Sequence, residues 1–429
     1  MASTGNAPPV PAGKSVTAVL VGTPGDLSNL RAGVNMLKGL IGFGILALPW
    51  ATAQVGLVPS CIGMGLIAIG TLSGILLSDI AKDRIDGNGS ELEMLVQEGK
   101  LADPSSADAW GSGLGFFDKL VGQVLGFGAQ VLCIVGILLL QFGTGVAYIS
   151  TVSENLQTLV NVSRARATLA VGMTYAVLSL FDRLRRITYL SLFALLVYVV
   201  IFAALLVEGI SEGTRSSDLV KPPVNLVKLS SPQYGVWFGV CAFAFGGFPI
   251  ANVIRNDMQH KEDFPHVMMV TFLVCWVLYA VFSTLGYVFY GDSVQEIIYM
   301  SFPEGSVASL ASLISVTIIL SFSFVLQMTP IYMFVRPFLP SVHYAIINAI
   351  IVSLATATAF FIPDIIFIIS TMGAVGGELC GFVLPALVYL KLSSHHEVWL
   401  RCLAVGVLIM GFVGAGMAVS DAVRKEFGK

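Results

Sequence analysis

The sequence predicts an all-α, polytopic membrane protein, and its composition and the length of its apolar runs support that fold class. Of the 429 residues, 56% are hydrophobic and only 11% are charged, and the mean hydropathy is +0.85. Such a chain is too apolar for an ordinary soluble domain. The apolar runs continue for about 20 residues, the length of a spanning helix, whereas a membrane β-barrel would show alternating segments of about ten.

The hydropathy along the chain predicts eleven spanning helices in a single domain, residues 29–420. The spans lie at residues 29–55, 58–80, 119–149, 166–181, 187–208, 234–252, 265–290, 307–336, 342–361, 364–389 and 398–420. We expect residues 1–28 to form a disordered tail without a cleavable signal peptide, and residues 421–429 to form a short tail on the opposite side.

The distribution of charged residues predicts the orientation of the chain. Lys and Arg are more frequent in the segments that lie on the same side of the membrane as the N-terminus. This distribution predicts a cytoplasmic N-terminus and a non-cytoplasmic C-terminal tail. Asn161, in the triplet Asn161-Val162-Ser163, would then lie outside and is a candidate glycosylation site.

Other functional classes lack their sequence signals. The net charge is −3, and no basic tract supports binding to nucleic acid. The six cysteines lie within apolar runs without the spacing of a metal site. The five histidines lie near span ends or in loops and form no catalytic constellation. We therefore expect no enzyme activity, no cofactor and no metal centre, with the lipid bilayer as the surroundings of the chain.

Two spans contain glycine and proline at places where a continuous helix would have neither. The first has Gly42-Phe43-Gly44 followed by Pro49, and the sixth has Gly246-Gly247 followed by Pro249. Glycine costs a helix about 1 kcal/mol relative to alanine, and proline removes an internal hydrogen bond. Each motif alone is also compatible with close helix packing. Their recurrence five spans apart predicts helix breaks near the middle of the membrane.

Interrupted spans at corresponding positions indicate a transporter built from two inverted repeats. The repeats would comprise residues 29–208 and 234–389, and residues 398–420 would form an additional helix. At each break, free N–H groups with positive dipole character suit a carboxylate, and free carbonyl groups suit an ammonium group. A zwitterionic amino acid requires both.

Motifs in several spans have the order and spacing of one known family. Residues 37–49, LKGLIGFGILALP, are similar to its LLKGNIGTGLLGLP, and the third span carries Gln141-Phe142-Gly143, Tyr148 and Glu154-Asn155. The sixth span adds Phe243-Ala244-Phe245. In these features the chain resembles the amino acid/auxin permeases, and most closely the proton-coupled amino acid transporters among them. The resemblance covers nearly the whole helical region.

The resemblance implies a LeuT-like fold of the APC superfamily, with a 5+5 inverted repeat and an eleventh helix, and secondary active symport of small neutral amino acids. Carried over to the matching positions, the substrate carboxylate would bind at Gly42, Phe43 and Gly44. Its amino group would bind at Phe243, Ala244 and Phe245, beside Gly246. Tyr148 would close the pocket, and packing at the membrane interface is the alternative role for this side chain.

The coupling ion is the least determined feature, because two positions depart from the family pattern. Asn35 replaces a histidine of the proton-coupled members, and Gly246 replaces a glutamate. Lys38 occupies a position at which sodium-coupled relatives carry asparagine, and its ammonium group would repel sodium. A proton is therefore the expected ion, and Ser321 and Ser323 on the eighth span are candidate ligands for the weaker sodium alternative.

Lys38 and Glu378 are the ionisable residues deepest within spans. A charged, unpaired side chain at the centre of a spanning helix costs about 2.5 to 3.5 kcal/mol. We therefore expect the two groups to meet, and one or both to exchange a proton during transport. Snorkelling of Lys38 to the membrane surface and a permanent ion pair between the first and tenth helices are the structural alternatives.

An amino-acid sensor with the same fold is the alternative to transport. Such a protein would need a signalling domain, and residues 1–28 and 81–118 are short for one. The plasma membrane and the lysosomal or vacuolar membrane are equally compatible with the spans.

Overall fold

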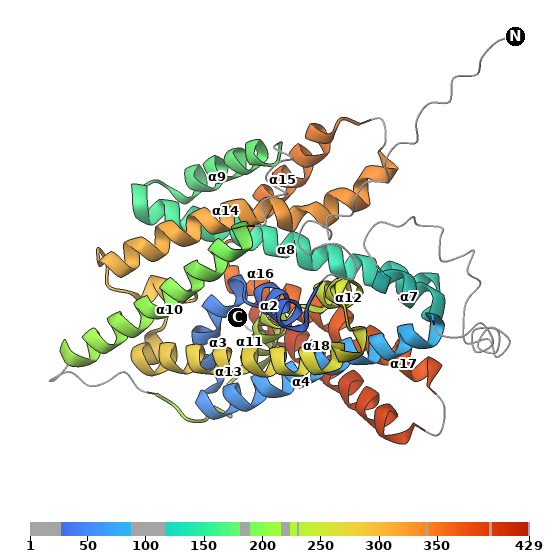
Figure 1. The fold of residues 1–429 in the computed structure, drawn as a ribbon. Helices are drawn as coiled ribbons and strands as arrows, with labels where there is room; N and C mark the ends of the chain where they lie inside the picture. Colours follow the sequence, from blue (N-terminus) through green and yellow to red (C-terminus); the bar gives the residue numbers. More distant parts are fainter. Residues whose placement is uncertain are drawn as a thin grey trace, which may run out of the picture.

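The computed structural model describes residues 27–86, 116–180, 189–215, 224–229, 231–339, 342–393 and 397–427. Nearly all of these residues lie in helices (Figure 1). Seven of the described helices are long and apolar enough to cross a membrane, or up to eight if a bent pair counts as one span. The predicted all-α membrane architecture is confirmed. Of the predicted tail at residues 1–28, residues 1–26 lie outside the described residues.

The helices follow the order of the predicted spans. The first half of the chain forms α2 (Asn29–Leu40), η1 (Phe43–Ala47), α3 (Leu48–Val55), α4 (Leu57–Asp86), α7 (Phe116–Leu125), α8 (Phe127–Val160), α9 (Arg164–Leu178) and α10 (Tyr189–Arg215). The second half forms α11 (Tyr234–Ala244), α12 (Phe248–Asp257), α13 (Phe264–Tyr290), α14 (Val307–Val335), α15 (Tyr344–Phe361), α16 (Ile365–Met372), η8 (Gly373–Gly377), η9 (Leu379–Val383), α17 (Leu384–Leu392) and α18 (Val398–Phe427).

The two broken spans occupy the middle of the bundle. In Figure 1, α2, α3, α11 and α12 lie between α8 on one side and α13 with α4 on the other. Helices α9, α14 and α15 lie beyond α8 and contact it. The outer helices therefore enclose the segments in which the sequence places its breaks.

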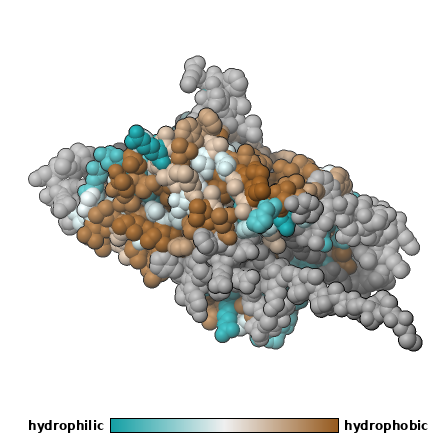
Figure 2. Space-filling model, turned by 90° about the horizontal axis from the view of Figure 1, so that it is seen from above, coloured by the Kyte–Doolittle hydropathy of each residue, from teal (hydrophilic) through white to brown (hydrophobic). Residues whose placement is uncertain are grey.

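The outward faces of the helices carry large apolar side chains. Exposed examples on five different helices are Met173, Leu196, Leu273, Ile350 and Phe412. Brown, hydrophobic surface predominates over the coloured part of the face in Figure 2. Contiguous apolar surface of this kind is a liability in water, and it suits contact with lipid tails.

The tenth span, α16 to α17, packs against its neighbours through glycine backbone. A Cβ atom added to Gly373 would lie 1.9 Å from the carbonyl oxygen of Gly239 in α11. One added to Gly376 would lie 2.6 Å from the carbonyl oxygen of Gly136 in α8, and one added to Gly74 of α4 would lie 2.0 Å from that of Gly381. Small residues allow such close approach of membrane helices. Within this span, η8 and η9 are π-helical.

The last helix is attached to the start of α11. The carboxylate of Asp421 accepts hydrogen bonds from the backbone N–H groups of Gly235 and Val236, at 2.7 and 3.1 Å. An acidic side chain at this position satisfies N–H groups that a helix leaves without partners at its start. Helix α18 continues to Phe427, so Asp421–Phe427 are helical where the sequence suggested a tail.

We expect Gly373→Ala to destabilise the protein by about 1 to 3 kcal/mol, because the added methyl group overlaps the backbone of α11. Gly381→Ala is the matched control, since a Cβ atom there has no neighbour within 4 Å. The apparent melting temperature of each purified variant in detergent measures the effect. Equal melting temperatures for the two variants would contradict the packing described above.

Candidate functional site

The first span breaks immediately before the Gly42-Phe43-Gly44 motif. Helix α2 ends at Leu40, Ile41 and Gly42 have extended backbone, and η1 begins at Phe43. The helical segments on the two sides of the break differ in direction by 51°. Because the first N–H groups of a helix have no partner within it, those of Phe43 and Gly44 point out of the start of η1.

The sixth span breaks at its two glycines. Helix α11 ends at Ala244, Phe245 to Gly247 form a turn, and α12 begins at Phe248. The N–H of Gly247 donates a hydrogen bond of 2.7 Å to the carbonyl of Phe245 within this turn. The turn separates the final carbonyl groups of α11 from the start of α12.

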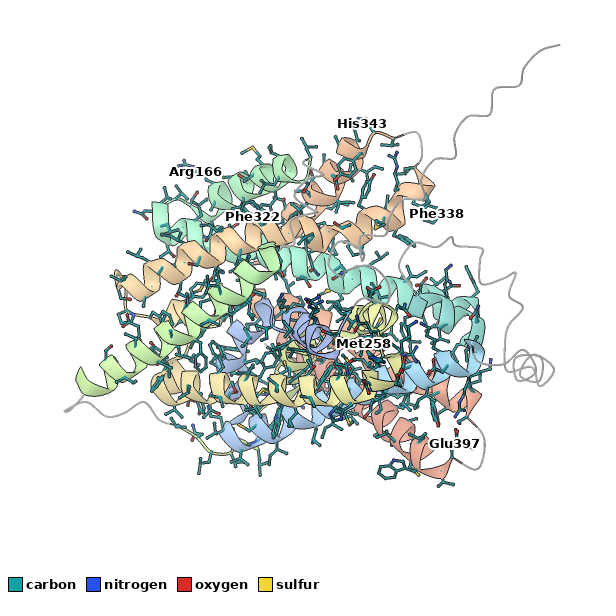
Figure 3. The ribbon with its side chains drawn as sticks, viewed as in Figure 1. Arg166, Met258, Phe322, Phe338, His343 and Glu397 are labelled. Carbon is teal, nitrogen blue, oxygen red and sulfur yellow. The ribbon has the colours of Figure 1, made fainter. Side chains whose placement is uncertain are left out.

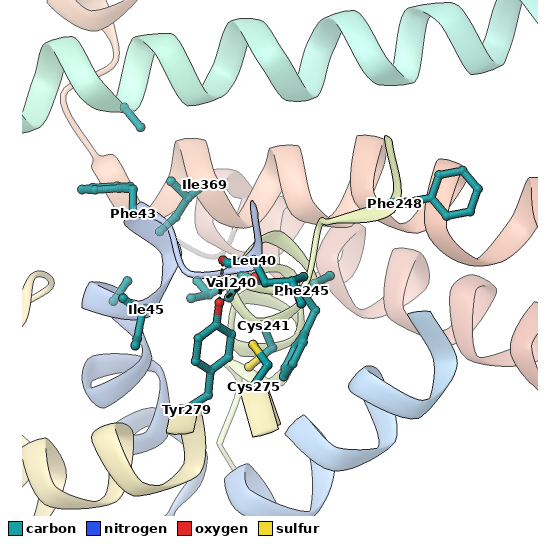
Figure 4. Close-up of a cluster of buried hydrophobic side chains, with 14 of the residues drawn as sticks. Leu40, Phe43, Ile45, Val240, Cys241, Phe245, Phe248, Cys275, Tyr279 and Ile369 are labelled. Carbon is teal, nitrogen blue, oxygen red and sulfur yellow. Dashed lines mark hydrogen bonds between the residues drawn. The ribbon is translucent and has the colours of Figure 1, made fainter. Parts of the chain in front are cut away.

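One tyrosine connects the two breaks. The hydroxyl group of Tyr279 in α13 lies 2.7 Å from the carbonyl oxygen of Leu40 and 3.1 Å from that of Ala244 (Figure 4). A tyrosine hydroxyl has a single hydrogen to donate, so the two carbonyl groups share it. Tyr279 is fully buried. It therefore holds the C-terminal ends of α2 and α11 side by side.

The broken segments also touch each other directly. A Cβ atom on Gly44 would lie 2.9 Å from the Cα atom of Ala244, and one on Gly247 would lie 2.6 Å from the Leu40 side chain. The absence of side chains at these glycines is what permits the contact. The two motifs that the sequence singles out, about 200 residues apart, are thus neighbours in the fold.

Tyr148 lies beside the first break. Its ring meets the ring of Phe43 edge to face, with 5.8 Å between the ring centroids. Both side chains are buried, as are Phe245 and Ala244. Tyr148 thus lies in the interior of the bundle against η1.

The space at the second break is closed in this conformation. A cavity of about 10 Å³ is lined by Phe245 and Gly246 together with Gly376 and Gly377 of the tenth span. This is room for about one water molecule. A bound amino acid would require the broken segments to move apart.

Contacts also close one end of the bundle, the end at which α2 begins and α4 and α12 finish, here called the proximal end. Leu27 forms a parallel β-bridge with Met258. Arg255 in α12 forms ion pairs with Asp79 and Asp83 in α4, the latter at 2.6 Å. Figure 3 labels Met258 in this region. These contacts tie the start of the first span to the end of the sixth, and the sixth span to α4.

Comparison with known sequences identifies the family. The family described as transmembrane amino acid transporter protein matches residues 25–423. The chain belongs to this family. The resemblance to amino acid/auxin permeases is therefore confirmed, and the family is one of transporters rather than of enzymes.

Several relatives carry transporter names. Amino acid transporter AVT3B of Arabidopsis thaliana is 25% identical over 404 residues, which are 90% of this chain and 91% of the relative. Amino acid transporter ANT1 of the same plant is 24% identical and covers 92% of both chains. Vacuolar amino acid transporter 4 of Saccharomyces cerevisiae is 26% identical over 67% of this chain and 38% of its own length.

Among solved structures, the inward-facing conformation of Mhp1 resembles the chain. The TM-score is 0.51 at 11% sequence identity, covering 94% of this chain and 92% of the other. This similarity confirms the LeuT-like fold class.

The structure separates the two buried charges that the sequence suggested as partners. Glu378, on the tenth span, is 1% exposed, and neither carboxylate oxygen has a hydrogen-bond partner among the described residues. Its Oε1 atom lies only 2.7 Å from the position that a Cβ atom of Gly414 in α18 would occupy. Lys38 lies in the last turn of α2, where its charge suits the helix dipole. The expected pairing of Lys38 with Glu378 is absent from this conformation.

Other candidate residues have simpler local roles in this conformation. Pro49 and Pro249 lie in the first turns of α3 and α12, where proline is tolerated, so the glycines rather than the prolines mark the breaks. The hydroxyl of Ser321 donates to the carbonyl of Thr317 at 2.7 Å, a bond within its own helix. Ser323 is partly buried on the same helix.

Sequence reasoning missed Tyr279 and the glycines of the tenth span. Tyr279 lies in the middle of α13, whereas tyrosines of membrane helices concentrate at the interfaces. A hydroxyl group at that depth needs a hydrogen-bond partner. This requirement could have marked Tyr279 in the sequence as a residue with a structural role. No comparable signal marked Gly376 and Gly377, because glycine is frequent throughout the chain.

We expect Tyr279→Phe to destabilise the protein by about 1 to 3 kcal/mol, because the change leaves buried carbonyl groups without a donor. Tyr175→Phe is the matched control. Tyr175 is also buried, but its hydroxyl lies 3.4 Å from that of Ser321, which already bonds within its own helix. The melting temperature and the amino-acid uptake of both variants measure the effect. Similar losses of stability and uptake in the two variants would argue against the connection of α2 and α11 through Tyr279.

Proposed function

We propose that the protein is a secondary active symporter of small neutral amino acids that works by alternating access around the breaks in the first and sixth spans. The observation that carries the proposal is the contact between these breaks in the middle of the bundle. There, Gly44 near the start of η1 lies against Ala244 at the end of α11, which brings the free N–H groups of one break close to the final carbonyl groups of the other. Opposite partial charges placed this close suit the two ends of a zwitterion.

In the proposed complex, the substrate carboxylate accepts hydrogen bonds from the N–H groups of Gly42, Phe43 and Gly44. The ammonium group donates to carbonyl groups at Phe243, Ala244 and Phe245. Tyr148 covers the carboxylate side through its contact with Phe43. Binding at this place would compete with the hydroxyl of Tyr279 for the carbonyl of Ala244.

The surroundings favour a small, uncharged side chain on the substrate. The cavity beside Phe245 and Gly246 has no charged side chain in its lining. Gly376 and Gly377 line its opposite wall without side chains, so a modest separation of the two spans would open space for a small group. A charged substrate would find no compensating charge there.

Alternating access requires the broken spans to part at one end at a time. The ion pairs of Arg255 and the bridge between Leu27 and Met258 close the proximal end in this structure. These contacts would have to separate for substrate to leave or enter at that end. The opposite end would open by movement of α3 and α11 relative to the rest of the bundle.

A proton is the coupled ion in this proposal, and Glu378 is the residue that exchanges it. A buried carboxylate without a partner is costly, and taking up a proton removes the cost. Gly414 of α18, which lies against its Oε1 atom, has no side chain, and Phe238 of α11, which packs against Gly414, is uncharged. The charged groups on the same side of the bundle lie near the end opposite the proximal end. They are Glu296, Asp364, Asp421 and Arg424. Lys38 remains a second candidate if conformational change brings it closer.

Uptake of radiolabelled alanine into proteoliposomes containing the purified protein tests the function. We expect accumulation driven by an inward proton gradient in the absence of sodium. Accumulation that requires a sodium gradient would favour the sodium alternative and renew interest in Ser321 and Ser323. Binding of amino acids without any accumulation would favour the sensor alternative and contradict the proposal.

Glu378→Gln tests the role of the carboxylate. We expect the variant to bind amino acids but to lose proton-driven accumulation, with counterflow exchange retained, because glutamine cannot exchange a proton. Glu304→Gln in an exposed loop is the matched control. An unchanged dependence of uptake on external pH, at normal yield of folded protein, would exclude Glu378 as the coupling residue.

The names of the yeast relatives favour the vacuolar or lysosomal membrane over the plasma membrane. We propose that location, with the N-terminus in the cytoplasm. Asn161 is exposed at the C-terminal end of α8, a position accessible to glycosylation if that end faces the lumen.

A further inference from the structure

A groove outside the proposed substrate site lies between α11, the tenth span and α18. It has a volume of about 700 Å³, within the range of sites that hold drug-sized ligands, roughly 300 to 1,000 Å³. Most of its wall is apolar, with Val236 from α11, Phe367 and Leu379 from the tenth span, and Phe412 from α18. The proposed substrate contacts at Gly42–Gly44 and Phe243–Gly246 do not line it.

The groove contains a buried carboxylate without a partner. Glu378 belongs to its lining, is 1% exposed, and has no hydrogen bond to either oxygen among the described residues. The Oε1 atom of this carboxylate faces Gly414 of α18, and Gly411 and Ala415 of the same helix line the groove. Gly414 and Ala415 lie three and four residues beyond Gly411 and therefore share its helix face.

No cation of the groove wall is close enough to compensate Glu378. Arg424 is the basic residue in the lining, and it lies ten residues beyond Gly414 on α18 (424 minus 414). At a rise of about 1.5 Å per residue, the separation along the helix is about 15 Å. The charge required beside Glu378 must therefore come from a proton or from a bound cation.

The groove is also open towards the outer surface of the bundle. Val375 and Phe412, both in its lining, are 44% and 60% exposed. Side chains exposed at this depth of a spanning helix face the lipid. An apolar molecule dissolved in the bilayer can therefore enter the groove without passing through the substrate path.

We propose that this groove binds a lipophilic amine, with the ammonium group on the Glu378 carboxylate and the apolar body along α18. An amine that enters in its neutral form takes the proton of the carboxylic acid, and the products are an ammonium and a carboxylate ion. Both charges then lie side by side in a medium of low dielectric constant, where their attraction is strong. A neutral molecule of the same shape gains only the apolar contacts.

Monodansylcadaverine, a primary amine with an aromatic body, and N-pentyl dansylamide, which lacks the amine, form a matched pair of fluorescent probes. Each is titrated into the full-length protein in nanodiscs, with empty nanodiscs as the reference for lipid partition. We expect the amine to bind about tenfold more tightly than the neutral probe. Glu378→Gln should abolish this preference.

Two further variants keep the test independent of any folding defect in Glu378→Gln. Ala415→Phe fills the groove and retains the carboxylate, so it should weaken the binding of both probes. Ile409→Phe makes a comparable change at an exposed position of α18 outside the groove lining, and should leave binding unchanged. Equal affinity of the two probes for the unaltered protein, or undiminished binding to Ala415→Phe, would overturn the proposal.

The binding measurement uses no amino acid and no ion gradient, so its outcome is separate from that of the transport assay. If the proposed function also holds, the amine should slow proton-driven alanine uptake, because it keeps Glu378 ionised. Failure of alanine uptake alone would leave the amine site standing, and failure of amine binding alone would leave the transport proposal standing.

Discussion

The need to satisfy backbone carbonyl groups inside a membrane governs the arrangement of the two broken spans. A helix that stops at mid-membrane leaves its final carbonyl groups without donors, and lipid offers none. The chain meets this need at both breaks with a single buried hydroxyl, that of Tyr279, between Leu40 and Ala244. The same hydrogen therefore satisfies two helix ends and fixes their separation. The two breaks are therefore held next to each other.

The tenth span packs closely against the helices at the centre of the bundle. Its glycines bring backbone against backbone with α8 and α11, and its π-helical turns stand next to the buried Glu378. Irregular helix turns of this kind are frequent at functional sites. Tight packing and an unpaired carboxylate thus occupy the same segment.

Much of this architecture could be predicted from sequence, because composition and apolar run length reflect the lipid surroundings directly. The breaks could be placed because glycine acts locally on the backbone, and Gly42 and Gly247 lie at the ends of helices as expected. The pairing of Lys38 with Glu378 could not be tested by depth alone, since equal depth leaves the rotation of each helix undefined. Glu378 faces α18 instead. The role of Tyr279 depends on contacts between three helices, which no single segment encodes.

The hydrogen bonds from Gly235 and Val236 to Asp421 give the final helix a mechanical role. They couple a peripheral helix to the half of the sixth span that would move in the proposed alternating-access cycle. In that cycle, helix α18 would either move with this half or break both hydrogen bonds. In both cases the lateral pressure and thickness of the surrounding bilayer would bear on the energy difference between the states.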